Sequence, residues 1–217
     1  MKIAAEILSI LYVRLFVTLS VRGSVVESSI DGICEAIRSD SEEGLELLTQ
    51  EADKLIQSYC PVIDWTSLQV GNSNVQKYLL TEMWKEVSPN IVEFPPNDTI
   101  LHVEHVLPKK PQPNTYSEFN KVEMDIHKNH IGNLTLLLKE DNIYISNKDF
   151  ATKKLIYELY DPKQGDGARE SRSDYLNIEL TSRIANCDTW NKENIREQAE
   201  FYSKIANKRW NLDRIDD

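Results

Sequence analysis

The sequence changes its hydrophobic pattern at Pro95-Pro96, and this change requires a helical part followed by a part that contains β-strands. Before the prolines, apolar residues recur at the three- and four-residue spacing of amphipathic helices. After them, β-branched and aliphatic residues cluster in short runs that are typical of strands. The helical segments predicted before the prolines are 4–21, 25–38, 44–59 and 74–87.

The residues after the prolines predict a ββα unit. Two strands are expected, at 99–107 and 133–138, with a helix at 149–160. Asp141-Asn142 is typical of a turn between the second strand and that helix. About 20 mostly polar residues separate the two strands, and a loop of that length in a compact domain is usually functional.

These elements predict an α+β fold that is mainly α-helical, with a ββα core flanked by helices. We expect an α-helical region over 1–95, which packs on or docks to another domain, and a second domain over 96–217. The core of this second domain spans about 99–160, and an amphipathic helix follows at about 191–210. Trp190, just before that helix, is expected to anchor the core.

The net charge of −10 argues against a protein that binds nucleic acids through general electrostatic attraction. The charge is uneven along the chain, however. Residues 1–100 carry 7 Lys and Arg against 15 Asp and Glu, whereas residues 101–217 carry 18 against 20. The second half is therefore nearly neutral, and the acidity of the chain does not exclude a nucleic-acid partner there.

The cysteines and the N-terminal segment both favour a cytoplasmic protein. The three cysteines are far apart and form no CxxC pair, which argues against a disulfide scaffold or a zinc ribbon. Residues 1–24 superficially resemble a signal peptide, but Glu6 and Arg14 interrupt the apolar run and leave no membrane-spanning segment. We expect a largely buried helix there and no membrane partner.

The residues that carry chemistry lie on the predicted ββα unit. Glu104-His105 is near the end of the first strand, Gly132-Asn133 begins the second, and Asn142 follows nine positions after Asn133. Phosphodiester hydrolysis needs a base to activate water, and neutral imidazole is the natural base near pH 7. A carboxylate and an amide oxygen form a sparse site for a hard cation such as Mg²⁺. Each pair alone is common in ordinary strands and turns, but their order on one ββα unit favours the functional interpretation.

Three stretches of the sequence carry a family resemblance: VEHVLP, IGNLTLLLKEDN and SNKDFATKK. They resemble an HNH nuclease domain of the His-Me finger (ββα-metal) superfamily. More closely, they resemble the C-terminal domain of GmrSD-type modification-dependent restriction endonucleases and related phage-defence proteins. The likeness covers about residues 74–210. It implies a DNA endonuclease that uses Mg²⁺ or Mn²⁺, acts on foreign or modified DNA, and depends on an upstream sensor domain or partner subunit.

The resemblance also implies a role for each matched residue. His105 matches the general base, and Asn133 matches the residue that ties the loop together and helps to orient the histidine. Glu104 and Asn142 match the metal ligands, with Asn in place of the final His of the HNH motif. Lysines for which we predict contacts with the DNA backbone are Lys153, which matches a recurrent family lysine, and Lys109 and Lys110 after the first strand.

The sequence therefore predicts a metal-dependent DNA endonuclease of the restriction or phage-defence type. His105 would deprotonate the attacking water, while a cation held by Glu104 and Asn142 stabilises the departing 3′ oxygen. We expect weak intrinsic DNA affinity that salt reduces strongly. The alternative is a catalytically restrained or inactive DNA-binding or protein-interaction module of a larger defence complex, which the acidic first half favours. Metal binding and plasmid nicking distinguish the two.

Overall fold

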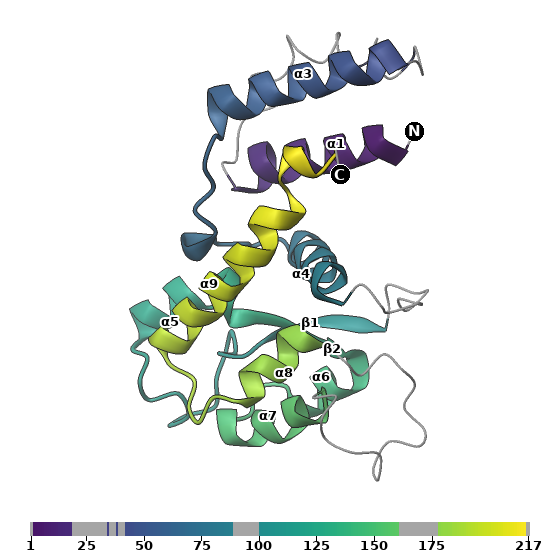
Figure 1. Ribbon diagram of the computed structural model, residues 1–217. Coiled ribbons are helices and arrows are strands. Elements are labelled where there is room, and N and C mark those ends of the chain that lie inside the picture. The colour runs from purple at the N-terminus through teal and green to yellow at the C-terminus, as the bar shows by residue number, and fades with distance from the viewer. Residues whose placement is uncertain are drawn as a thin grey trace. The chain divides into compact units, whose positions relative to one another are not determined.

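The computed structural model describes residues 2–18, 34, 38, 42–88, 100–160 and 178–215 (Figure 1). The chain divides into two compact units, Met1–Trp65 with Ala206–Asp217, and Thr66–Ile205. The sequence predicted a division near residue 95, but the helix before that point belongs to the second unit. The chain returns to the first unit at Ala206, so this boundary between the units falls inside α9 (Lys192–Arg209).

The described elements of the first unit are helices. It contains α1 (Lys2–Leu11), a π-helix (Tyr12–Thr18) and α3 (Glu42–Tyr59), and α1 packs against α3 and the 3₁₀-helix Leu212–Ile215. The helices predicted at 4–21 and 44–59 are confirmed over the residues that the structure describes, whereas most of 25–38 lies outside them. None of the described helices is long and apolar enough to cross a membrane.

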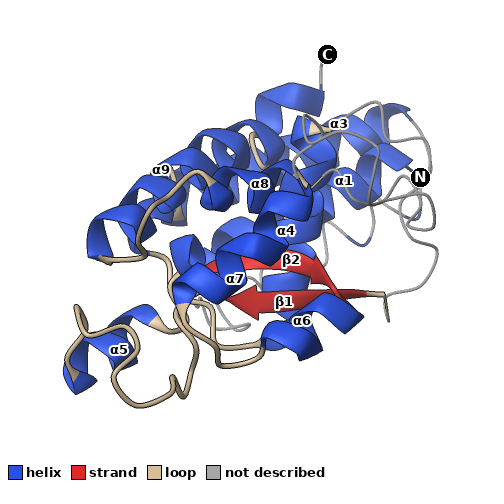
Figure 2. Ribbon diagram, turned by 90° about the horizontal axis from the view of Figure 1, so that it is seen from below, coloured by secondary structure: helices blue, strands red, loops and turns tan. Residues whose placement is uncertain are grey.

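The second unit is built around a two-stranded antiparallel sheet (Figure 2). Strand β1 (Leu101–His105) pairs with β2 (Leu134–Leu138) so that Leu101 lies opposite Leu138 and His105 opposite Leu134. Helices α4 (Ser73–Val87) and α6 (Lys139–Ile145) contact both strands. Because helices cover the sheet, β2 is an almost continuous apolar run and is nearly all buried.

Side-chain caps explain where several helices of this unit begin. The Asn72 side chain accepts hydrogen bonds from backbone N–H groups in the first turn of α4. In the same way, Asp149 accepts the N–H of Thr152 at 3.0 Å at the start of α7 (Phe150–Tyr157). A 3₁₀-helix, Glu158–Tyr160, continues α7, so the helix predicted at 149–160 is confirmed. The observed α9 likewise confirms the helix predicted at about 191–210.

Two local predictions were wrong: the turn at Asp141-Asn142 and the loop between the two strands. A helix farther along the chain was not predicted. Asp141-Asn142 forms no turn but lies inside α6, where the Asp141 carboxylate is in the first helical turn and accepts the Tyr160 hydroxyl at 2.8 Å. The long polar stretch between the strands contains α5 (Lys121–His127). An Asn120–Glu123 capping box begins this helix, a local signal that the apolar pattern did not reveal. Helix α8 (Glu179–Ala185), which packs against β2, was not predicted.

Candidate active site

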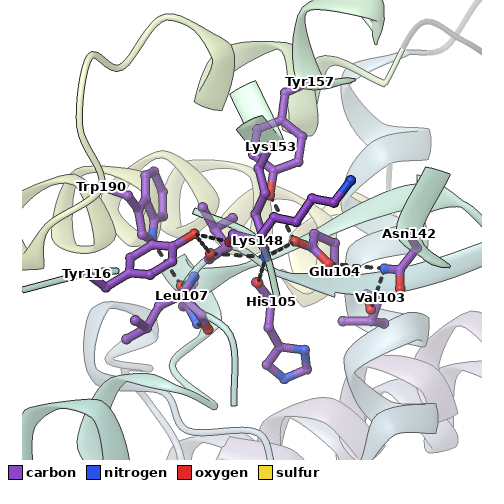
Figure 3. Close-up of polar contacts among 12 residues, drawn as sticks. Val103, Glu104, His105, Leu107, Tyr116, Asn142, Lys148, Lys153, Tyr157 and Trp190 are labelled. Carbon is purple, nitrogen blue, oxygen red and sulfur yellow. Dashed lines mark hydrogen bonds and ion pairs between the residues drawn. The ribbon is translucent and has the colours of Figure 1, made fainter. Parts of the chain in front are cut away.

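The end of β1 directs two adjacent side chains to opposite sides of the strand. Glu104 is 4% exposed and turns toward α6 and α7, which supply its partners. The His105 imidazole points away from the Glu104 carboxylate (Figure 3). The structure therefore brings Glu104 together with Asn142 of α6, and among the described residues no hydrogen bond joins the His105 ring to either.

The two carboxylate oxygens of Glu104 have different partners. Oε1 accepts a hydrogen bond from Lys153 Nζ at 2.5 Å and another from the Tyr157 hydroxyl at 2.9 Å. Oε2 accepts from Asn142 Nδ2 at 3.2 Å, and the same amide nitrogen donates to the Val103 carbonyl oxygen at 3.1 Å. One carboxylate oxygen is thus held by α7, while the other faces α6.

Lys153 is buried and lies against this carboxylate. Its ammonium also donates to the carbonyl oxygens of His105 at 2.7 Å and Val106 at 3.3 Å (Figure 3). Burial raises the pKa of Glu104 and lowers the pKa of Lys153, and the attraction between the two groups opposes both shifts. We predicted a phosphate contact for Lys153, but its side chain is 0% exposed and faces the protein interior.

Burial also dominates the chemistry of His105. It lowers the pKa of the imidazole to about 4, with smaller contributions in the same direction from Lys109 and Lys153 and an opposing one from Asn129. Its Nε2 atom is buried and has no hydrogen-bond partner in the described part of the chain. The ring is therefore neutral at pH 7 and is able to accept a proton.

Asn133 ties together the segments around the strand ends. Its Oδ1 atom accepts from the backbone N–H of Leu107 at 2.7 Å and from Trp190 Nε1 at 3.0 Å. Its Nδ2 atom donates to the carbonyl oxygens of Leu107 at 2.9 Å and Lys128 at 3.2 Å. These bonds fix the loop after His105 to the segment before β2. Trp190 is 2% exposed, as expected for a core anchor.

The model of one protein family matches most of this unit. It describes the C-terminal domain of GmrSD restriction endonucleases and matches residues 63–205. The chain belongs to this family. Membership confirms the predicted resemblance and identifies a nuclease-type domain whose substrate class is DNA. No curated protein matches the chain.

In this GmrSD C-terminal domain, the remaining predicted DNA contacts lie on the surface. Lys109 and Lys110 are exposed in the loop after β1, and Lys109 is near enough to His105 to influence its pKa. They are available to a phosphate, whereas Lys153 is not. His102, on the opposite side of β1 from His105, is half-buried.

Two tyrosines near Glu104 and His105 were not predicted from the sequence. Tyr157 contacts Glu104, and the Tyr116 hydroxyl donates to the Val106 carbonyl oxygen at 2.6 Å. The spacing of Lys153 and Tyr157 on α7 was the available signal, because residues four apart share one helix face. Tyr116 lies in the long inter-strand segment and had no such signal.

The donors around Glu104 fit a hard divalent cation. Glu104 Oε2 and the Val103 carbonyl oxygen both lie within hydrogen-bonding distance of the Asn142 amide. Turning that amide by 180° would replace its nitrogen with Oδ1 and bring three oxygens, the ligand atoms that Mg²⁺ prefers, near one another. Among the described residues there is no group of three or more His, Cys, Asp or Glu side chains that could hold a metal. A cation here would therefore have few protein ligands.

The lowered pKa of His105 predicts a loss of stability in mild acid. In the unfolded chain the imidazole has its ordinary pKa of 6.5, so it binds a proton between pH 7.5 and 5 that the folded protein does not bind. The unfolded state is then favoured, and the free energy of unfolding falls by about 1–2 kcal/mol from this group. Urea unfolding in EDTA at both pH values measures it. The His105→Gln variant should lack this part of the loss; an equal loss in both proteins would contradict the prediction.

Proposed function

We propose that this domain hydrolyses DNA phosphodiester bonds by an HNH mechanism that uses one divalent cation, in defence against foreign or modified DNA. The observation that carries the proposal is the β1–β2–α6 arrangement, in which Asn142 of α6 meets Glu104 of β1, the residue just before the neutral His105. This contact supports a ββα-metal site, with Asn142 on a helix instead of the expected turn. Membership in the GmrSD family supports a DNA substrate.

His105 is the proposed general base. Burial keeps this imidazole neutral at pH 7, so its ring nitrogen is free to take a proton. It would take a proton from the water that attacks phosphorus. The hydrogen bonds of Asn133 to Leu107 hold the backbone just after His105, which supports its position without contact with the reacting atoms.

Glu104, Asn142 and the Val103 carbonyl group are the proposed cation ligands. A bound Mg²⁺ or Mn²⁺ would stabilise negative charge on the departing 3′ oxygen. Lys109 and Lys110 are proposed to contact the DNA backbone, because both are exposed next to the strand that carries the site. With so few cationic contacts, DNA binding should be weak, and added salt should weaken it further.

Plasmid nicking tests this function. The purified chain should nick supercoiled DNA with Mg²⁺ or Mn²⁺ and stop when EDTA removes the cation. Asn142→Ala removes one proposed ligand and should reduce the rate about 10- to 100-fold at limiting Mn²⁺, with partial recovery at high Mn²⁺. Asn186→Ala, an exposed asparagine after α8, is the matched control and should nick like the parent. Nicking that persists in EDTA would exclude the metal mechanism. No nicking together with no Mn²⁺ binding would favour the inactive binding module.

A further inference from the structure

Lys153 places a positive charge directly on the one carboxylate of the proposed cation site. Its Nζ lies 2.5 Å from Glu104 Oε1, and the side chains of both residues are almost fully buried, at 0% and 5% exposure. Lys154, the next residue on the same helix, has a different environment. Its side chain is partly exposed and pairs with the fully exposed Asp188 at 3.5 Å. The contrast marks Lys153 as part of the site.

The contacts of Lys153 match its charged form. Its Nζ donates to three acceptors, namely Glu104 Oε1 and the carbonyl oxygens of His105 and Val106. An ammonium group has three N–H donors, one for each acceptor, whereas a neutral amine has only two. The ion pair is therefore Glu⁻–Lys⁺, and its net charge is zero.

A cation that reaches Glu104 meets a neutral pair with few open ligands. Oε1 already accepts bonds from Lys153 and Tyr157, which leaves Oε2, the Val103 carbonyl and the Asn142 amide. Mg²⁺ and Mn²⁺ are usually held by more than one charged oxygen, from carboxylates or from the phosphates of a substrate. The protein alone therefore offers little electrostatic attraction for a divalent cation.

We propose that Lys153 makes cation binding at Glu104 depend on DNA. The inference rests on the proposed function, since it assigns the missing charge and ligands to the phosphate that the site would cleave. A backbone phosphate contributes a full negative charge and oxygen ligands, so the cation is retained when DNA is present and released when it leaves. By linkage, the cation must then strengthen DNA binding by the same factor. Such a domain binds its divalent cation tightly only when DNA is also bound.

Mn²⁺ binding with and without DNA measures the dependence directly. The full chain carrying His105→Ala is used, so that ordinary duplex DNA is not cut, and free Mn²⁺ is followed by electron paramagnetic resonance at low salt. Binding by DNA alone is subtracted. We expect the apparent Mn²⁺ dissociation constant to fall at least about tenfold when DNA is added. Equal affinity with and without DNA would overturn the inference.

Variants of Lys153 test the cause. In the same background, Lys153→Met removes the charge and should bind Mn²⁺ without DNA at least about tenfold more tightly, so that the effect of DNA shrinks. Lys153→Gln keeps an N–H donor and carries the test if the methionine variant does not fold, as judged by circular dichroism. Folded variants that keep the parent's weak DNA-free affinity would refute the role of Lys153.

Two controls separate charge from other effects. Lys154→Met makes the same charge change one residue away and should leave Mn²⁺ binding unchanged in both conditions. Tyr157→Phe removes a hydrogen bond from the same Glu104 oxygen without changing the charge, and it should keep the dependence on DNA; loss of the dependence in this variant would contradict a charge effect. If the His105→Ala chain binds no Mn²⁺ even with DNA and the parent does not nick, the proposed function itself fails.

Discussion

Replacing His105 with alanine should slow plasmid nicking by about 10²- to 10⁴-fold, the usual contribution of a general base. The variant loses the only group that the proposed mechanism gives to proton transfer from water. It keeps Glu104, Asn142 and Lys153, whose hydrogen bonds are made by other side chains and by the backbone of residue 105. Single-turnover nicking at saturating Mn²⁺ measures the loss, and Mn²⁺ binding with DNA should remain.

His102→Ala is the matched control for this loss. It removes an imidazole from the same strand, but His102 faces the other side of β1 and has no place in the proposed chemistry. Its nicking rate should stay within about twofold of the parent's, because the His102 imidazole supplies neither the base nor a cation ligand in the proposed mechanism. The assignment of the base is wrong if His105→Ala cuts as fast as the parent protein, or if His102→Ala loses as much activity.

The sequence predicted the parts of the site that depend on local pattern. Both strands, the helix after them and the C-terminal helix were found, because apolar spacing reflects the faces that become buried. The order of Glu104, His105, Asn133 and Asn142 identified the family, which the match over residues 63–205 confirmed. The meeting of Glu104 and Asn142 followed from pairing the strands, although Asn142 was expected on a turn and lies on a helix.

What the sequence could not predict depends on packing between distant segments. Lys153 looked like a surface cation, since lysine is almost never buried unless it is paired. Only the fold places it against Glu104, 49 positions earlier in the chain, where three acceptors hold the ammonium. The lowered pKa of His105 was likewise invisible, because it arises from burial by residues that are remote in the sequence.

Gly132 shows a second packing effect, with the largest stability change that we expect. In the sequence a glycine before a strand is ordinary turn chemistry, and turns favour glycine mainly where they need a positive φ angle. No described glycine has one. Instead Gly132 lies under α9: a Cβ atom there would be 2.0 Å from the carbonyl oxygen of Ile195 and 2.9 Å from the backbone nitrogen of Ala199. Those neighbours are helix backbone, which cannot move aside as a flexible side chain can.

Gly132→Ala should therefore destabilise the 66–205 unit by at least about 3 kcal/mol, the upper part of the range for overpacked cores. For a chain of this size the midpoint of thermal unfolding should fall by about 6–12 °C. The site should suffer as well, because α9 pushed away from Gly132 would disturb the adjacent Asn133, whose hydrogen bonds hold the loop after His105. Nicking per folded molecule, measured well below the new midpoint, should fall.

Gly71→Ala makes the same chemical change where nothing lies within 4 Å of the added methyl group. Its stability should stay within about 0.5 kcal/mol of the parent's. Comparing the two variants isolates the effect of the close contact with α9. Both variants lose the same backbone freedom in the unfolded chain, and they differ only in what the new carbon meets. Equal midpoints for the two variants would show that α9 does not hold Gly132 as the structure has it. If only Gly132→Ala loses stability, the close contact with α9, and not a turn, explains why glycine stands directly before Asn133.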